Sequence, residues 1–200
     1  MLAAIVLAAG ASQRMGGHPK ALLMWQGEAF LTGILKACYA AGIERRVAVL
    51  GHHAGRILAA VDLAGVTVTH SAELAAGPIG SIRAGLAAVQ RHPVDGILVW
   101  PVDRPHVQVR TVAALVGAFA EGTHAIVVPR FGDARGHPVI FGRAVFEELR
   151  AAPDDQGARA VVRRDAARVR VVPVDDAAVV LVVNPPDEYA DLVRRSDPPA

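Results

Sequence analysis

The residues best suited to chemistry lie in one glycine-rich turn near the start of the sequence. An apolar run from Ala3 to Ala9 ends at Gly10, and small residues follow it. Small residues let backbone N–H groups approach a polyanion closely. Arg14 adds a rigid fork of donors and Lys20 adds a mobile positive charge, and both suit phosphate oxygens. The turn is therefore predicted to hold a phosphate chain.

Two common phosphate-binding loops do not fit this turn. A Walker loop needs a lysine directly after its last glycine, whereas Gly17 is followed by His18. A dinucleotide-binding fingerprint needs glycine at the positions of Ser12 and Met15. The turn must therefore bind phosphate in another way.

A second candidate group follows the strand predicted over Gly96 to Trp100. Asp103 stands directly after that strand, between Pro101 and Pro105. In open α/β sheets ligands lie at the carboxyl ends of the strands, so this carboxylate would face the phosphate chain. The alternative is a turn-forming aspartate held between two prolines.

The glycine-rich turn resembles the signature of the MobA-like nucleotidyltransferases, a family that includes the molybdenum-cofactor guanylyl- and cytidylyltransferases. That signature reads L-A-A-G-x-S-x-R-M-G, with a lysine a few residues later. The segment around Asp103 resembles the magnesium motif x-D-x-P of the same family, and the likeness extends from Leu7 to Tyr189. All the fixed positions of the turn are present, as Leu7, Ala8, Ala9, Gly10, Ser12, Arg14, Met15, Gly16 and Lys20.

The resemblance implies transfer of a nucleoside monophosphate from a nucleoside triphosphate to a phosphate acceptor such as molybdopterin, with release of pyrophosphate. It implies that Arg14, Lys20 and Asp103 are catalytic. Arg14 would bind the β- and γ-phosphates, Lys20 the α-phosphate, and Asp103 a Mg²⁺ ion with help from Asn184. The implied nucleotide-binding set is Leu7, Ala8, Ala9, Gly10, Ser12, Arg14, Lys20, Gly80 and Ser81.

Two further segments resemble acceptor-side motifs of the family. One is Gly-His-Pro around His137, and the other is a G-D-x-G-A-R-like segment that ends at Arg159. Each residue also has a structural reading, because His137 can simply fix its loop and Arg159 can lie on a solvated basic face. Ser81 likewise either caps its helix or lies beside the base, or does both.

Three departures from the family pattern bear on the activity. Arg104 stands where relatives usually carry an uncharged residue, and Ser71 stands where they often carry asparagine. Asn184 takes the place of a second aspartate that is usually linked to the metal. Asparagine still offers a neutral oxygen, but the lost charge should weaken Mg²⁺ binding unless the triphosphate supplies the missing anions.

The preferred nucleotide is predicted to be CTP. Ala9, where guanylyltransferases usually carry glycine, and the G-x-x-x-S segment that ends at Ser81 favour cytosine. The spacing between Gly16 and Lys20 is more like that of the guanine branch. The alternatives are a guanylyltransferase, an NAD(P)H-dependent oxidoreductase of the same fold family, and a non-catalytic chaperone that hands molybdenum cofactor to a recipient molybdoenzyme.

Composition indicates a globular protein. The 200 residues are 52% hydrophobic, which is enough for the core of a single domain over positions 1–200, and the resemblance implies that it is a nucleotidyltransferase domain. A net charge of +2 with scattered basic residues argues against a nucleic-acid partner, and no apolar run approaches the ~20 residues of a membrane span. Cys38 is the single cysteine, which excludes an internal disulfide and favours a reducing, cytoplasmic location.

The elements that must position these groups alternate between strands and helices. That order predicts right-handed crossovers and a largely parallel sheet, with residues 133–141 running antiparallel or as an excursion. With the resemblance, it predicts an α/β fold, a three-layer Rossmann-like nucleotidyltransferase fold with a mostly parallel mixed sheet. His52 and His53, after the second strand, are expected to be solvated rather than bound to a metal. Strands are predicted over 3–9, 46–50, 66–69, 96–100, 125–128, 169–172 and 179–183, and helices over 30–41, 56–61, 81–90, 109–120, 144–151 and 186–195.

Overall fold

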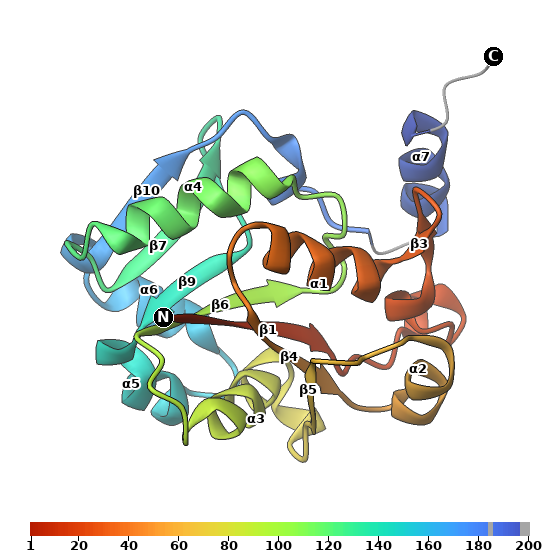
Figure 1. Ribbon diagram of the computed structural model, residues 1–200, viewed down its shortest axis with the longest axis horizontal. Coiled ribbons are helices and arrows are strands. Elements are labelled where there is room, and N and C mark those ends of the chain that lie inside the picture. Colours follow the sequence, from red (N-terminus) through yellow and green to blue (C-terminus); the bar gives the residue numbers. More distant parts are fainter. Residues whose placement is uncertain (184–185, 197–200) are drawn as a thin grey trace.

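The computed structural model describes residues 1–183 and 186–196, and it contains one large β-sheet with helices on both faces (Figure 1). Within the described residues this sheet has eight strands, in the order β10-β7-β9-β6-β1-β4-β5 with β8 paired to β7. The strands are β1 (Leu2–Ala8), β4 (Arg45–Leu50), β5 (Thr67–His70), β6 (Gly96–Pro101), β7 (Ile126–Phe131), β8 (Ala134–Arg135), β9 (Val139–Gly142) and β10 (Val169–Pro173). A small separate hairpin consists of β2 (Met24–Trp25) and β3 (Glu28–Ala29).

Most strand pairs of the large sheet are parallel. β1 pairs in parallel with β4 and β6, β4 with β5, and β10 with β7. β9 runs antiparallel between β6 and β7. Residues 3–6 of β1 are apolar and fully buried, as expected of a strand covered on both faces. The predicted α/β fold with a mostly parallel mixed sheet is confirmed, and β8 and β9 are the antiparallel strands that form around the 133–141 segment.

Helices cover both faces of this sheet, which gives three layers (Figure 1). One face carries α1 (Phe30–Ala40) and α4 (Val109–Ala120), with α2 (Ala54–Ala60) at its edge. The opposite face carries α3 (Pro78–Val89), α5 (Phe146–Ala151) and α6 (Ala158–Arg164). α7 (Pro186–Ser196) lies beside the hairpin, where the Tyr189 hydroxyl donates to the Met24 carbonyl at 2.9 Å. None of the helices in the described ranges is long and apolar enough to cross a membrane.

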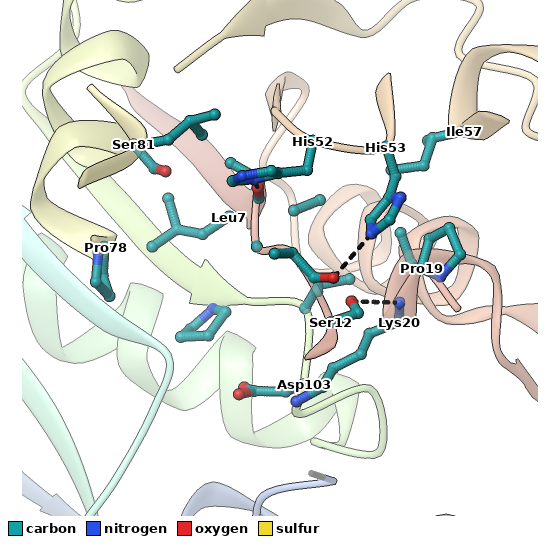
Figure 2. Close-up of a pocket in the computed structure, with 18 of the residues that line it drawn as sticks. Leu7, Ser12, Pro19, Lys20, His52, His53, Ile57, Pro78, Ser81 and Asp103 are labelled. Atoms are coloured by element: carbon teal, nitrogen blue, oxygen red, sulfur yellow. Dashed lines mark hydrogen bonds between the residues drawn. The ribbon is translucent and has the colours of Figure 1, made fainter. Parts of the chain in front are cut away.

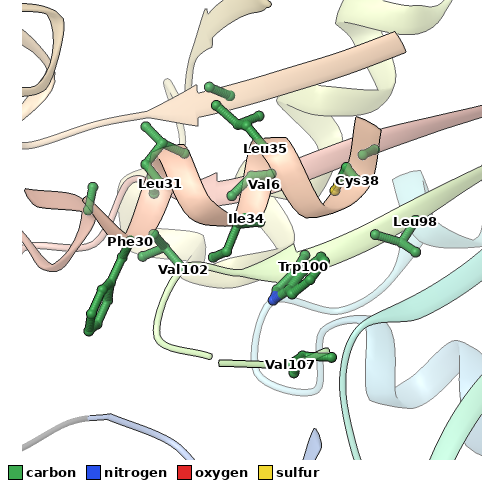
Figure 3. Close-up of a cluster of buried hydrophobic side chains, with 14 of the residues drawn as sticks. Val6, Phe30, Leu31, Ile34, Leu35, Cys38, Leu98, Trp100, Val102 and Val107 are labelled. Carbon is green, nitrogen blue, oxygen red and sulfur yellow. The ribbon is translucent and has the colours of Figure 1, made fainter. Parts of the chain in front are cut away.

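Trp100 of β6 anchors the core on the α1 face. Its side chain is fully buried beneath α1, where Figure 3 also places Leu31, Ile34 and Cys38. The buried indole N–H has a hydrogen-bond partner, because it donates to the Arg104 carbonyl at 2.9 Å. This bond fixes the loop that follows β6. Burial raises the pKa of the Cys38 thiol to about 12, which keeps it neutral and unreactive.

β1 is the strand at which the connections of the sheet reverse direction. The chain passes from β1 to β4 on one side and later returns to β6 on the other side. Parallel strands end at the same edge of a sheet, so the turns after β1, β4 and β6 converge there. The fold therefore brings the glycine-rich turn and the Asp103 segment to one edge.

One predicted strand is wrong. Residues 179–183 do not form a strand, because Ala177–Val179 is a 3-10 turn and the described chain continues from it as turn and coil. Asp176 explains the difference: its carboxylate accepts hydrogen bonds from the Ala178 amide at 3.2 Å and the Thr111 hydroxyl at 2.7 Å. The apolar run that resembles a strand is thus fixed by a polar contact to α4.

The predicted helix cap at Ser81 is also wrong. α3 begins at Pro78, and Gly77 precedes it with φ 66° and ψ −143°. Proline is favoured at the first helical position because it has no N–H group that would need a partner there. Ser81 therefore lies inside the helix. The remaining 3-10 turns of the described chain are Gln13–Met15, Lys20–Leu22, Leu74–Ala76, Arg143–Val145 and Ala166–Arg168.

Candidate functional site

The glycine-rich turn after β1 adopts left-handed backbone conformations. Ser12 has φ 51°, and Gly16 and Gly17 have φ 60° and 76°. A non-glycine residue rarely adopts this conformation, and here three contacts hold it. The Ser12 carbonyl accepts from the amides of Met15 at 2.9 Å and Gly17 at 3.2 Å, and its hydroxyl accepts from the Lys20 amide at 3.2 Å. Ser12 therefore closes the turn on itself, and we call residues 9–20 the phosphate turn.

The first part of the phosphate turn presents unused backbone donors. Within the described ranges, the amides of Gly10 and Ala11 donate no hydrogen bond to another residue. The carbonyls of Ala9 and Ala11, in contrast, accept hydrogen bonds from the segment after β4. Backbone N–H groups that are left open in this way suit an anion.

A cavity of about 530 Å³ opens where β1, β4 and β6 end (Figure 2). Its walls are the phosphate turn, the segment after β4, the start of α3, and residues 101–103. This size lies within the range of small-molecule sites. The predicted nucleotide-binding residues that line the cavity are Leu7, Ala8, Ala9, Gly10, Ser12, Lys20 and Ser81.

Lys20 and Asp103 come together in this cavity. Figure 2 shows the Lys20 side chain extending from the phosphate turn toward Asp103. Burial raises the pKa of the Asp103 carboxyl, and the positive charges of Lys20 and Arg104 oppose that rise. One carboxylate oxygen, Oδ1, is buried and has no hydrogen-bond partner among the described residues. A buried oxygen without a partner is costly, and a cation would satisfy it.

A cation at Asp103 would need ligands from elsewhere. The described residues contain no group of three or more His, Cys, Asp or Glu that could hold a metal ion. Mg²⁺ is commonly held by one or two carboxylates together with substrate phosphates, so a single aspartate would fit this ion if a phosphate ligand entered the same cavity. Asn184, the predicted second ligand, lies outside the described residues. The chain just before it reaches the site, because the Val183 amide donates to the Asp103 carbonyl at 2.9 Å.

The two remaining predicted nucleotide-binding residues are Gly80 and Arg14. Gly80 lies within α3, and a Cβ atom there would lie 2.3 Å from the Glu73 carbonyl oxygen. Gly80 therefore allows α3 to approach the preceding segment closely. The Arg14 side chain lies outside what the structure describes, although its backbone belongs to the 3-10 turn Gln13–Met15.

The two predicted acceptor-binding residues do not line this cavity. His137 is half-buried, and its amide donates to the Val179 carbonyl at 2.9 Å. Burial, with a smaller effect from the charge of Arg104, lowers the pKa of His137 to about 4. Its Nδ1 is buried without a partner among the described residues. Arg159 is exposed on α6.

Two histidines, His52 and His53, have a role that the sequence pattern does not predict. The sequence predicts both to be solvated rather than bound to a metal, and His52 is indeed exposed, but both rings also contact the backbone of the phosphate turn. His53 Nε2 lies 2.9 Å from the Ala11 carbonyl oxygen, and His52 Nδ1 lies 3.3 Å from the Ala9 carbonyl oxygen. Their position directly after β4, the strand beside β1, is the signal that could have indicated this contact.

Arg104 also has a role that the sequence does not reveal. Its Nη1 donates to the carbonyls of Val179 at 2.7 Å and Leu181 at 2.9 Å. These bonds connect the segment after β6 to residues more than 70 positions later in the chain. Arg104 therefore holds residues 179–183, which we call the last loop, against the Asp103 segment.

Comparisons with known proteins agree with this geometry. Residues 4–171 match the family model of the MobA-like NTP transferase domain. A nicotine blue oxidoreductase of Paenarthrobacter nicotinovorans is 29% identical over 178 residues, covering 86% of this chain and 86% of the relative. A molybdenum cofactor guanylyltransferase of Ralstonia nicotianae is 32% identical over 205 residues, covering 96% of this chain and 95% of the relative.

A solved structure has the same architecture. The Rv0371c protein of Mycobacterium tuberculosis is 32% identical, with a TM-score of 0.82 over 96% of this chain and 97% of that chain. The same protein in complex with manganese gives a TM-score of 0.80 at 31% identity, over 96% of this chain and 98% of that chain. The likeness therefore spans the whole fold and not only the phosphate turn.

Proposed function

Because the chain belongs to the family of MobA-like NTP transferase domains, we propose that it transfers a nucleoside monophosphate from a nucleoside triphosphate to a phosphate acceptor. The leading case is CMP transfer from CTP to molybdopterin or a similar acceptor. Family membership gives a nucleotidyltransferase fold, and the residues at the cavity support the choice of reaction.

One observation carries the proposal: Lys20 and Asp103, which are far apart in the sequence, meet beside the unused amides of the phosphate turn. A triphosphate needs donors along its oxygens and a positive charge near the phosphorus that is attacked. The amides of Gly10 and Ala11 are available for the former, and Lys20 supplies the latter.

In the proposed reaction a phosphate oxygen of the acceptor attacks the α-phosphorus of the nucleotide. A new P–O bond forms, the bond to the bridging oxygen of the β-phosphate breaks, and pyrophosphate leaves with that oxygen. The residues contribute alignment and charge neutralisation, and no covalent enzyme intermediate is required. Lys20 would contact the α-phosphate, and the turn amides with Arg14 would contact the β- and γ-phosphates.

Magnesium is proposed as the cofactor, with Asp103 and Asn184 as its protein ligands. The buried Oδ1 of Asp103 without a partner among the described residues supports this assignment. When bound, the ion would neutralise negative charge on the phosphate oxygens. The triphosphate itself would complete the coordination, because a single described carboxylate is too few.

The acceptor side is proposed to include His137 and Arg159. A neutral imidazole at His137 can donate a hydrogen bond to an anionic acceptor without bringing a full charge into a buried place. Arg159 is exposed on α6 and could contact a phosphate that enters from solvent. A recipient molybdoenzyme for the product is a further proposal and follows from the nature of this acceptor.

Thermal-shift titration against CTP, GTP, ATP and UTP with Mg²⁺ tests both the function and the choice of base. A ligand at 100 times its Kd should stabilise the native state by about 2.7 kcal/mol. We expect the largest shift with CTP. A larger shift with GTP would assign the chain to the guanine branch, which the likeness to the Ralstonia guanylyltransferase favours. Binding of molybdenum cofactor, together with no pyrophosphate release from any nucleotide in a separate assay, would indicate a chaperone.

The likeness to the nicotine blue oxidoreductase supports a second candidate function, NAD(P)H-dependent reduction of a quinonoid dye. This reading needs no phosphate transfer and no divalent ion. Oxidation of NAD(P)H with a dye acceptor in the presence of EDTA would support it. Pyrophosphate release that stops on addition of EDTA would support the nucleotidyltransferase instead.

A further inference from the structure

The segment directly after β4 contacts the backbone carbonyls of the phosphate turn. His53 Nε2 lies 2.9 Å from the Ala11 oxygen, an interaction drawn as a dashed line in Figure 2. The Ala9 oxygen has two contacts with His52, the ring Nδ1 at 3.3 Å and the backbone amide at 3.4 Å. Two adjacent histidines thus hold two alternate carbonyls of the turn.

These contacts depend on a close approach between the segment after β4 and the phosphate turn. A Cβ atom on Gly51 would lie 2.4 Å from the Ala9 oxygen, so only glycine lets the backbones come this near. One turn further along α2, Arg56 Nη1 donates to the Gly17 oxygen at 3.3 Å. The contacts therefore extend from Ala9 to Gly17 and cover both ends of the glycine-rich part.

The histidine contacts decide which way the peptide groups face. A carbonyl only accepts hydrogen bonds, so the ring nitrogens that face Ala9 and Ala11 must carry protons and donate. With these oxygens held by α2 and the segment before it, the amides of Gly10 and Ala11 are left without a described partner beside the cavity. Donors that are fixed before a charged ligand arrives need not be reorganised when it binds.

We propose that His52 and His53 are positioning residues that preset the phosphate turn for the triphosphate of the nucleotide. This inference rests on the proposed function, because it assigns the turn to triphosphate binding. The histidines act through the backbone of the turn and need not contact the phosphates. In this role they are not metal ligands, although the His52 side chain is also exposed to solvent.

Conservative variants can distinguish the effect of losing the hydrogen bond from the effect of losing the imidazole ring. Glutamine places an N–H near the position of a histidine Nε2, and asparagine places one near Nδ1. We therefore compare His53→Gln with His53→Leu, and His52→Asn with His52→Leu. His70→Gln is the matched control, because His70 is exposed at the end of the neighbouring strand β5 and does not line the cavity.

The probes are inorganic triphosphate with Mg²⁺, and cytidine as a ligand that lacks phosphates. We expect His53→Leu to weaken triphosphate binding about fivefold, the effect of one lost hydrogen bond, and to leave cytidine binding unchanged. His53→Gln should restore most of the affinity. With triphosphate bound, hydrogen exchange at the Gly10 and Ala11 amides should be slower in the glutamine variant than in the leucine variant, because only the bound anion gives these amides a partner.

A positioning role also predicts which kinetic constant changes. In the leucine variants the KM for the nucleotide should rise more than kcat falls. The lost hydrogen bonds loosen the turn in the free protein, and the bound triphosphate then orders it. Equal triphosphate affinity in His53→Leu and the unchanged chain would overturn the inference. So would an equal loss of triphosphate and cytidine affinity, which would indicate general damage to the site.

The two proposals can fail separately. If the unchanged chain binds triphosphate in a His53-dependent manner but releases no pyrophosphate from any nucleotide, the proposed function is wrong and the positioning inference stands. If it releases pyrophosphate and His53→Leu does so with unaltered KM, only the inference is wrong. A chain that binds neither triphosphate nor nucleotide would overturn both.

Discussion

Lys20 and Asp103 are the residues on which the proposed chemistry depends most. Asp103 is half-buried with one carboxylate oxygen that lacks a described partner, so its negative charge is costly without a neighbouring cation. The nearby charge of Lys20 offsets part of that cost. Both side chains lie at the cavity that the phosphate turn lines. At this scale the site has one positive and one negative side chain at a cavity, an arrangement that supports the proposed binding of a phosphate chain and a metal ion.

Lys20→Ala and Asp103→Asn should each reduce pyrophosphate release about 10²–10³-fold, because each removes charge stabilisation that matters most in the transition state. Steady-state assays with Mg²⁺ and CTP or GTP measure this loss. Lys36→Ala is the matched control, since Lys36 is exposed and pairs with Glu28 at the surface. Normal turnover in either site variant would exclude the assigned role.

His137 should make the stability of the protein depend on pH. Its pKa falls from an ordinary 6.5 to about 4 in the folded state, chiefly because it is buried. Between these values the unfolded chain binds a proton that the folded chain does not, so stability is fully present above pH 6.5 and is lost as pH falls toward 4. The loss attributable to His137 should be about 3 kcal/mol.

Urea denaturation of the unchanged chain and of His137→Gln, at several pH values from 7 to 4, tests this expectation. The variant should show a smaller loss of unfolding free energy over that range. An NMR titration of the imidazole gives an independent measurement. A His137 ring that becomes protonated near its ordinary pKa in the folded protein would contradict the expectation.

At the scale of elements, two pairs of segments beside the cavity approach each other very closely. The turn after β4 approaches the phosphate turn at Gly51, where an added Cβ atom would meet the Ala9 oxygen. α3 approaches residue 73 at Gly80 in the same way. Glycine at these positions permits contacts between backbones that a side chain would prevent.

Gly51→Ala should therefore destabilise the fold by about 1–3 kcal/mol and weaken nucleotide binding, because the two turns must separate. Gly55→Ala, in α2, is the matched control, since nothing lies within 4 Å of an added Cβ atom there. The control should be neutral or stabilising by up to about 1 kcal/mol, as alanine favours a helix. Chemical denaturation and nucleotide titration of both variants measure these effects, and a Gly51→Ala variant as stable as Gly55→Ala would contradict the close approach.

At the scale of the whole molecule, residues 179–183, which follow the last strand of the large sheet, lie against the Asp103 segment. Arg104 donates to the carbonyls of Val179 and Leu181, and the Val183 amide donates to the Asp103 carbonyl. These contacts connect the segment after β6 with residues 179–183, more than 70 positions later in the chain. The segment that precedes the predicted second metal ligand is thus held by the residues around the first.

Arg104→Met should lower the unfolding free energy by about 1–3 kcal/mol, because two carbonyls lose a charged donor while the aliphatic part of the side chain is kept. It should also reduce pyrophosphate release, since the last loop loses its attachment to the Asp103 segment. Arg110→Met is the control, because Arg110 is exposed and makes one long bond, 3.4 Å, to the Asp175 carbonyl. An Arg104→Met variant that matches the control in both stability and activity would exclude the assigned role.

Local patterns in the sequence were enough to predict the core of the fold. The apolar run of β1 predicts a buried strand, and the alternation of strands with helices predicts the mostly parallel sheet. The same patterns place the phosphate turn and Asp103 after strands that prove to be neighbours in the sheet. They do so because strand burial and turn formation depend mainly on residues that are close together in the chain.

Tertiary structure decided which polar groups meet. The contact of His53 with Ala11, 42 positions earlier, follows only once β4 is known to lie beside β1, and no local pattern indicates that Arg104 reaches Val179, 75 positions later. The sequence also suggested a strand over residues 179–183, where the Asp176 carboxylate holds a 3-10 turn against α4. Hydrogen bonds between distant segments depend on how the elements pack, and a pattern of neighbouring residues does not record that packing.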